Sequence, residues 1–422
     1  MSKVLVVGRG GREHALAWKL STSERVRTVY VAPGNAGMKN AATTVDIDEN
    51  DFDALIAFAK KEGVTLTVVG PEVPLVGGIV DAFEREGLRI FGPTSKAAAI
   101  EGSKSFAKEL MKKRGVPTAD YETFGDFDLA ARHVEKADMP VVIKADGLAA
   151  GKGVTIAQTP EEAMAALREA LPGGRFGAAS QPVVVEKFLE GEEFSFIAMV
   201  NGGEVYPMAL SQDHKRAFDG DLGPNTGGMG AYSPVPQIDA ATVKTATEEI
   251  LIKTAKAMIA EGRPFTGFLY AGLIATKDGP KVIEFNARLG DPEAQALLPR
   301  LESDLFEAIT TLLDRAGDPA LKWSEDAAIG VTLGSKGYPG AYSTGFPIDG
   351  LDDLKDDTLV FHGGTDCVDG RCVTNGGRVL VVARKAPTLA LAQKEAYGEI
   401  AKIKCDNLFF RGDIGWRGLR NR

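Results

Sequence analysis

The chain has 422 residues, 44% of them apolar and 25% charged, a composition that excludes a disordered or fibrous protein and suggests roughly two to four domains. Its formal net charge of −9 argues against nucleic acid or an anionic membrane as the main partner. The N-terminus offers only the short apolar run Val4–Val7, and no apolar stretch of about 18 residues occurs anywhere, so we expect a cytoplasmic protein without a signal peptide or membrane span.

Strand and helix patterns alternate over the first 92 residues. Apolar runs predict strands at Val4–Val7, Thr28–Ala32, Leu66–Val69 and Leu88–Phe91, and helical patterns lie between them at Glu13–Leu20, Phe52–Lys61 and Val76–Glu86. This alternation is typical of a parallel, doubly wound sheet. The loops that follow the four strands are rich in Gly and Pro and should share the carboxyl edge of the sheet, where ligands bind.

The first of these loops runs from Gly8 to Arg12 and leads into the first helix. It departs from the dinucleotide-binding fingerprint, because Glu13 stands where a third glycine is required and the second strand ends without an acidic residue. It keeps backbone N–H groups at a helix start beside Arg9 and Arg12, a combination suited to a phosphate. The alternative is a tight turn that only packs the helix.

The pattern changes after a helix predicted at Ser103–Arg114. Strands are predicted at Pro140–Lys144, Val154–Ala157, Val183–Lys187 and Phe194–Val200, with a helix at Glu161–Ala170. The loop from Lys144 to Val154 is glycine-rich, but it lacks the P-loop spacing and joins strand to strand. It therefore fits a flexible flap over a triphosphate, with an ordinary hairpin loop carrying surface lysines as the alternative.

An irregular stretch, Ser211–Pro236, precedes further regular elements. These are a helix near Ala241–Ala260, strands at Gly267–Ile274 and Lys281–Phe285, and an amphipathic helix at Ser303–Arg315. Alternation at the end of the second strand puts Glu284 and Asn286 on one face. Two neighbouring oxygen-bearing side chains suit Mg²⁺, which completes its shell with phosphates and water.

From about Ala327 the chain is again rich in strand patterns, and it ends in a helix predicted at Thr388–Lys402. Asp369-Gly370 is a two-residue turn signal in which Val368 faces Arg371. Cys367 should therefore face Cys372 in the next, closely spaced pair of the hairpin. We expect both thiols to be reduced, because disulfides are rare in the cytoplasm.

These motifs together carry a resemblance to a known family. The matching segments, all in one order, are Gly8–Ala15, Ala32–Gly37, Gly70–Leu75, Glu101–Lys104, Ile143–Gly153, Ser211–Arg216, Gly223–Tyr232 and Arg288–Glu293. Over essentially its whole length the chain resembles the phosphoribosylamine–glycine ligases of the ATP-grasp superfamily. It departs from the usual pattern at Arg9, where asparagine is common, and at Leu289, where phenylalanine is common. The strand with Tyr270 lacks a glutamate that the wider superfamily often uses as a metal ligand.

The resemblance implies an α/β and α+β multidomain fold. It implies a doubly wound parallel-sheet domain over residues 1–102, an ATP-grasp core over 103–326 with a mobile flap subdomain at about 120–190, and an α+β domain over 327–422. The implied reaction is the ATP-dependent ligation of glycine to 5-phosphoribosylamine, a step of purine biosynthesis. It is implied to proceed through a glycyl phosphate intermediate and to give glycinamide ribonucleotide, ADP and phosphate. The implied metal is Mg²⁺ or Mn²⁺, and we expect a monomer or weak dimer.

The resemblance also implies roles for individual residues. The catalytic set is Asp213, Lys215, Arg288 and Asp291, and the metal ligands are Glu284 and Asn286. The ATP contacts are Lys104, Lys144, Gly147, Gly151, Lys152, Gly153, Glu186, Phe188 and Glu193. The phosphoribosylamine contacts are Gly10, Gly11, Arg12, Gly34, Asn35 and Glu72. The segment Asp213–Arg216 could instead be a solvated charged loop, and we expect His14 to cap or pack rather than catalyse.

Two rival classes stay open at this point. A related ATP-grasp carboxylase would use bicarbonate in place of glycine, and a regulatory nucleotide-binding protein would not turn over substrate. The intact metal pair and flap favour an enzyme.

Overall fold

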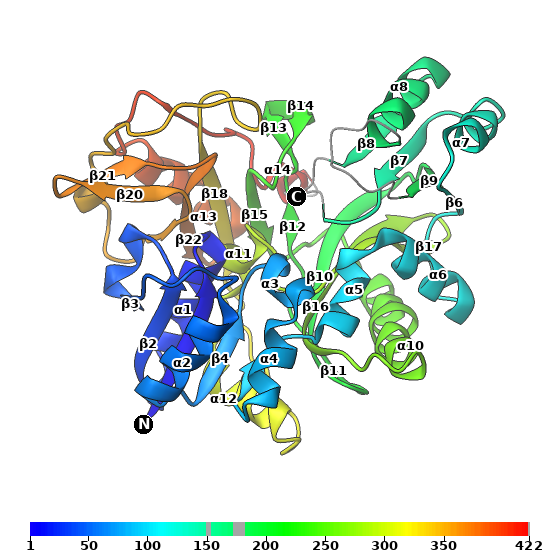
Figure 1. Ribbon diagram of the computed structural model, residues 1–422. Coiled ribbons are helices and arrows are strands. Elements are labelled where there is room, and N and C mark those ends of the chain that lie inside the picture. The colour runs from blue at the N-terminus through cyan, green and yellow to red at the C-terminus, as the bar shows by residue number, and fades with distance from the viewer. Residues whose placement is uncertain (149–152, 172–181, 421–422) are drawn as a thin grey trace.

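The computed structural model describes residues 1–148, 153–171 and 182–420 (Figure 1). The N-terminal segment forms one parallel sheet in the order β3-β2-β1-β4-β5. Its strands are β1 (Ser2–Gly8), β2 (Val26–Pro33), β3 (Thr43–Thr44), β4 (Leu66–Val69) and β5 (Ile90–Phe91). Its helices are α1 (Gly11–Ser21), the short η1 (Ala36–Asn40), α2 (Phe52–Glu62), α3 (Glu72–Gly77), α4 (Ile79–Arg85) and α5 (Ser95–Gly102).

Both faces of this sheet are buried, as a doubly wound fold requires. Along β1, Val4 and Val6 belong to one apolar core, and Leu5 and Val7 belong to another. The alternating strand and helix pattern is therefore confirmed. The single helix predicted at Val76–Glu86 is wrong, because Gly78 adopts a left-handed conformation with φ of 92° and separates α3 from α4.

Helix α6 (Lys104–Arg114) leads into a separate antiparallel sheet. Ser103 caps the helix by accepting a hydrogen bond from the N–H of Phe106, and Gly115 ends it in a left-handed conformation, close to the predicted bounds Ser103–Arg114. The sheet has the order β6-β9-β7-β8, with β6 (Tyr121–Phe124), β7 (Val141–Ala145), β8 (Val154–Ala157) and β9 (Val183–Lys187). Helices α7 (Phe127–Val134) and α8 (Pro160–Ala170) cover it and share its own apolar core, which marks a separate folding unit.

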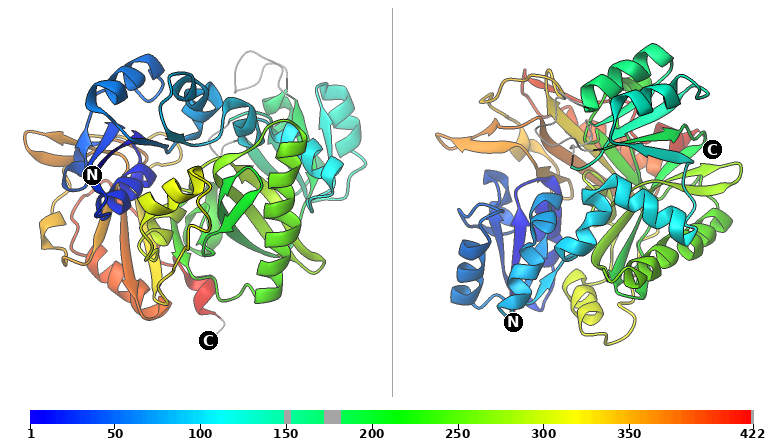
Figure 2. Two further views of the ribbon diagram at one scale, coloured as in Figure 1. Left: turned by 90° about the horizontal axis from the view of Figure 1, so that it is seen from below. Right: turned by 45° about the vertical axis from the view of Figure 1, so that its right-hand side comes forward.

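A second antiparallel sheet carries the predicted metal strand. Its order is β11-β10-β16-β17, with β10 (Glu192–Asn201), β11 (Glu204–Pro207), β16 (Thr266–Thr276) and β17 (Gly279–Asn286). The long helical segment beside it consists of α9 (Ala240–Thr245), a π-helical stretch η3 (Ala246–Ile252) and α10 (Lys253–Ala260). In the views of Figure 2 this sheet lies between the N-terminal segment and the β6–β9 sheet.

The C-terminal sheet is built from two separate parts of the chain. Its order is β12-β15-β18-β22-β19, and β23 (Leu408–Phe409) pairs with β18. The strands are β12 (Gln212–Asp213), β15 (Gly230–Ser233), β18 (Ala327–Ser335), β19 (Leu359–His362) and β22 (Arg378–Ala386). The stretch Ser211–Pro236 is thus not wholly irregular, because β12 and β15 find their backbone partners in this sheet, which their composition does not predict.

The remaining elements are short helices and two hairpins. The helices are α11 (Glu293–Leu297), α12 (Leu305–Leu313), α13 (Leu389–Ile400), α14 (Trp416–Leu419), η2 (Asp219–Asp221) and η4 (Leu351–Asp353). The hairpins pair β13 (Arg216–Phe218) with β14 (Leu222–Asn225) and β20 (Thr365–Val368) with β21 (Arg371–Thr374). Cys367 is the register partner of Cys372, as predicted. Among the described helices, none is long and apolar enough to cross a membrane.

Candidate active site

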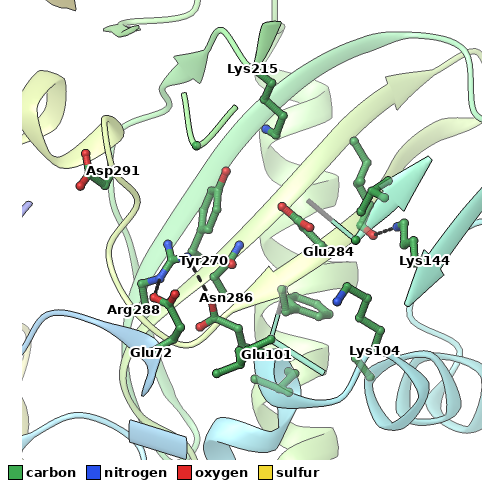
Figure 3. Close-up of a pocket in the computed structure, with 18 of the residues that line it drawn as sticks. Glu72, Glu101, Lys104, Lys144, Lys215, Tyr270, Glu284, Asn286, Arg288 and Asp291 are labelled. Carbon is green, nitrogen blue, oxygen red and sulfur yellow. Dashed lines mark hydrogen bonds and ion pairs between the residues drawn. The ribbon is translucent and has the colours of Figure 1, made fainter. Parts of the chain in front are cut away.

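A cavity of about 440 Å³ lies where the N-terminal loops, the β6–β9 sheet, the end of β17 and the C-terminal sheet meet (Figure 3). Thirteen of the residues assigned from the sequence line it: Arg12, Glu72, Lys104, Lys144, Gly147, Gly153, Glu186, Asp213, Lys215, Glu284, Asn286, Arg288 and Asp291. They come from segments far apart in the sequence. The fold therefore gathers most of the predicted site around one cavity.

Glu284 and Asn286 stand at the end of β17 and both line the cavity, as alternation along the strand predicts. The pairing of β16 with β17 shifts between Gly272 and Leu273, which places an irregularity beside Glu284. The described residues contain no cluster of three or more His, Cys, Asp or Glu side chains that could hold a metal ion. One carboxylate and one amide oxygen nevertheless fit Mg²⁺, which takes few protein ligands and fills its shell with phosphate and water oxygens.

Two lysines line the cavity near this pair: Lys104 from α6 and Lys144 from β7 (Figure 3). The Nζ of Lys104 donates to the carbonyl oxygen of Gly147 at 2.7 Å, and the Nζ of Lys144 donates to that of Ile283 at 2.8 Å. Burial lowers the pKa of Lys104, while Glu284 and Asp146 oppose this shift. A polyphosphate in the cavity would meet cations already held in place by backbone oxygens.

Glu186 is buried between two lysines. Its carboxylate lies 3.0 Å from the Nζ of Lys144 and 2.8 Å from the Nζ of Lys108. Sequence reasoning missed Lys108, although it follows Lys104 by one helical turn and therefore shares its face. Burial lowers the pKa of Lys108 to about 8, against the opposing effect of Glu186.

Arg288 is held between two carboxylates from the N-terminal segment. Its Nε lies 3.0 Å from an oxygen of Glu72, and its Nη2 lies 3.0 Å from an oxygen of Glu101. Burial raises the pKa of Glu101 to about 7. Burial also acts to raise the pKa of Glu72, but Arg288 and Arg12 outweigh it and lower that pKa to about 2. Glu101 was missed as a site residue, although it precedes Lys104 in a matching motif.

The two aspartates of the predicted catalytic set, Asp213 and Asp291, are both paired with cations. The two oxygens of Asp213 lie 3.0 and 2.9 Å from the Nζ of Lys215. Asp291 accepts from Gln295 at 2.8 Å and lies 3.4 Å from Arg378. Although burial acts to raise the pKa of Asp291, Arg378 lowers it, so this carboxylate is ionised.

Four further residues of the cavity were not found by sequence reasoning. Glu293 is buried and accepts hydrogen bonds from Tyr270 at 2.9 Å and from Ser195 at 3.1 Å. Arg378 and Tyr338 reach the cavity from the C-terminal segment, and both bond to Gly227. The positions of Arg378 and Tyr338 depend on tertiary packing, and no local motif marks them, whereas Glu293 ends a matching segment without having been assigned a role.

Of the predicted residues that the structure describes, six do not line the main cavity. Gly10 and Gly11 lie beside Asp291 at the start of α1, where the N–H of Gly10 already donates to Glu13 at 2.6 Å. Asn35, next to Gly34, caps η1 and donates to the carbonyl oxygens of Arg9 and His362. Glu193 borders a second cavity of about 10 Å³, and Phe188 is half-buried just after β9. Gly151 and Lys152 lie outside the described residues.

His14 packs, as expected, and does not face the cavity. Its Nδ1 accepts a hydrogen bond from the backbone N–H of His362 at 2.9 Å, and its ring meets that of Phe361 edge-on at 5.6 Å. It therefore joins α1 to the end of β19.

The buried lysines, the two antiparallel sheets and the paired oxygen donors at the end of β17 together indicate an ATP-grasp enzyme. Comparison with known proteins agrees with this class. Family models of phosphoribosylglycinamide synthetase match the N domain at residues 2–101, the ATP-grasp (A) domain at residues 102–294 and the C domain at residues 328–417.

Individual proteins similar to this chain belong to the same family. The chain is 59% identical over 419 residues to a phosphoribosylamine–glycine ligase of Halalkalibacterium halodurans, covering 99% of this chain and 98% of the relative. It is 34% identical to a phosphoribosylamine–glycine ligase from Thermotoga maritima, whose crystal structure matches with a TM-score of 0.86 over 98% of this chain and 100% of that chain. The chain therefore belongs to the phosphoribosylglycinamide synthetase family. A biotin carboxylase from Campylobacter jejuni, at 15% identity, shares the fold alone, with a TM-score of 0.74 over 97% of this chain and 93% of that chain.

Proposed function

We propose that the protein is a phosphoribosylamine–glycine ligase of purine biosynthesis, which couples ATP cleavage to formation of a C–N bond between glycine and 5-phosphoribosylamine. The observation that carries the proposal is the convergence of N-terminal loop residues with the lysines and the Glu284–Asn286 pair around one cavity. A junction of this kind gives two substrates and a nucleotide a common place to meet. The 59% identity over nearly the whole chain to a ligase of this name supports it.

The chemistry requires activation of a carboxylate, which is a poor acyl donor. We infer that the glycine carboxylate attacks the terminal phosphorus of ATP, releasing ADP and forming glycyl phosphate. The amine of phosphoribosylamine then attacks the acyl carbon and expels phosphate, which gives glycinamide ribonucleotide. Phosphoryl transfer of this kind depends mainly on positioning and charge neutralisation.

The proposed roles follow the positions in the cavity. Lys104 and Lys144 would neutralise phosphate charge, and Glu284 and Asn286 would hold Mg²⁺ or Mn²⁺, which adds neutralisation at the phosphates. Arg288, fixed from two sides, is placed to hold the glycine carboxylate or the acyl phosphate.

Substrate recognition would use the acidic residues and the N-terminal loops. Asp213 and Asp291 are the proposed partners of the glycine ammonium group. Phosphoribosylamine would lie along the N-terminal side of the cavity, against Arg12 and Glu72.

An ADP-release assay with freshly prepared phosphoribosylamine tests the proposal. We expect turnover only when ATP, glycine and phosphoribosylamine are all present, with glycinamide ribonucleotide as the product detected by mass spectrometry. Turnover without glycine, or turnover indifferent to phosphoribosylamine, would contradict it. Bicarbonate dependence would support a carboxylase instead, and ATP binding without any turnover would support a regulatory protein.

A further inference from the structure

We propose that Lys108 is a positioning residue of the nucleotide site, which acts through Glu186 to fix Lys144 and to tie the β6–β9 sheet to the strand carrying Glu284. The inference rests on the proposed use of ATP in this cavity. It concerns a residue that neither the motifs nor the proposed roles above assign.

Lys108 belongs to a continuous chain of polar contacts that starts and ends on β17. Thr118 donates to the carbonyl oxygen of Val282 at 2.8 Å and accepts from the Nζ of Lys108 at 2.7 Å. Lys108 then pairs with Glu186, which pairs with Lys144. Lys144 returns to β17 by donating to the carbonyl oxygen of Ile283, the residue that follows Val282.

The ends of this chain are adjacent residues, directly before Glu284. Its middle members come from α6, β9 and β7, so the loop of contacts joins the helix, the β6–β9 sheet and the metal strand. Each lysine lies within ion-pair distance of a different oxygen of Glu186, and the oxygen nearer Lys144 accepts no hydrogen bond from the described residues, so charge alone joins it to that lysine. The position of Lys144 in the cavity therefore depends on a carboxylate that Lys108 holds from the other side.

Because the ion pairs of this series of contacts are buried, we expect removal of one of the charged side chains to disturb the others. The side chains of Lys108 and Glu186 are 3% and 4% exposed. An ion pair shielded from water is strongly disturbed when one partner is removed, because the other charge stays buried. When Lys108 is removed, Lys144 is the cation of this series of contacts that still pairs with Glu186. The Glu186 carboxylate then competes with the phosphate oxygens of ATP for Lys144.

The experiment compares Lys108→Met with Lys112→Met in the full chain. Lys112 is one helical turn further along α6, is exposed, and like Lys108 lies 5.6 Å from the ring centre of Tyr121. We expect Lys108→Met to raise the KM for ATP by roughly tenfold and to leave the KM for glycine within about twofold, since the change acts on the nucleotide end of the cavity. Lys112→Met should match the unmodified enzyme in both constants.

A Glu186→Gln background separates positioning from direct contact with ATP. If Lys108 acts through Glu186, then Lys108→Met should have little further effect on the KM for ATP once the carboxylate is gone. A full effect in that background would mean that Lys108 contacts the nucleotide itself and would overturn the proposal. The double variant lacks both charges of the Lys108–Glu186 pair, so it gives a foldable comparison if Lys108→Met alone is unstable.

The outcomes distinguish this inference from the proposed function. An unmodified enzyme that fails to ligate glycine overturns the proposed function. An active enzyme in which Lys108→Met leaves the KM for ATP unchanged, or shifts the KM for ATP and for glycine equally, overturns the role of Lys108 alone.

Discussion

Glu284 is the residue on which the proposed metal site depends most, because its carboxylate is the charged member of the pair at the end of β17. We expect Glu284→Ala to lower kcat by roughly a hundredfold or more, since loss of this oxygen leaves the phosphate charge less well neutralised. Binding of glycinamide ribonucleotide, measured by calorimetry without ATP, should persist because the proposed position of that ligand is on the N-terminal side of the cavity.

Glu302→Ala is the matched control, since Glu302 is exposed and does not line the cavity. Its kcat should stay within about twofold of the unmodified enzyme, as expected for a surface substitution. Near-normal activity of Glu284→Ala would show that the metal assignment is wrong.

Local sequence patterns predicted one kind of site residue and missed another. Glu284 and Asn286 could be placed on one face because side chains in a strand alternate with a period of two. Glu101 and Arg378 could not be placed, because their contacts with Arg288 and Asp291 join positions far apart in the chain. Periodicity contains no information about such contacts, which arise only when separate sheets pack together.

Among the elements, the β20–β21 hairpin shows that a two-residue turn signal in the sequence can predict which residues of the two strands face each other. The Asp369-Gly370 turn has positive φ at both residues, and Cys367 faces Cys372 as the register requires. By contrast, β12 and β15 escaped prediction because they are short strands within a stretch rich in Gly and Pro, and they gain their pairing only from the completed sheet. Turn chemistry is local, whereas strand partners are not.

The same hairpin yields a prediction about thiol reactivity. Cys367 is exposed, whereas burial raises the pKa of the Cys372 thiol to about 11, helped by the nearby Cys367. Because the thiolate is the reactive form, iodoacetamide at about pH 8 should alkylate Cys367 well before Cys372. Peptide mass spectrometry over time gives the order of labelling.

Cys405→Ser serves as the control and should leave that order unchanged. Faster labelling of Cys372 would contradict the assignment of the exposed thiol. A native protein in which neither Cys367 nor Cys372 reacts before reduction would contradict the expectation that the pair is reduced.

At the scale of the whole molecule, the cavity is complete only when three parts of the chain meet. The N-terminal segment supplies Glu72 and Glu101, the central segment supplies Arg288, and the C-terminal segment supplies Arg378. The contact between His14 and His362 holds the outer two segments together on the side of the N-terminal sheet. That contact therefore contributes to holding together the parts of the chain that line the cavity.

This contact predicts a loss of stability in acid. Burial lowers the pKa of His14 to about 3 and that of His362 to about 4, from an ordinary value of 6.5. Above these values both rings are neutral in the folded protein, whereas the histidines of the unfolded chain bind protons below pH 6.5. The stability that the two histidines contribute is therefore fully present above pH 6.5. It falls as the pH drops toward 4 for His362 and 3 for His14. Near pH 4.5 we expect His14 alone to account for a loss on the order of 3 kcal/mol.

Thermal unfolding midpoints measured between about pH 7 and pH 4.5 check this expectation. His14→Gln keeps an acceptor for the N–H of His362 but does not titrate, so its midpoint should fall less steeply with acid than that of the unmodified protein. His133→Gln is the control, because His133 lies on α7 against Phe124, in the separate β6–β9 unit, and should keep the original slope. Equal slopes for the His14 variant and the unmodified protein would show that acid acts elsewhere, and that this histidine contact does not limit the joining of the N-terminal and C-terminal segments.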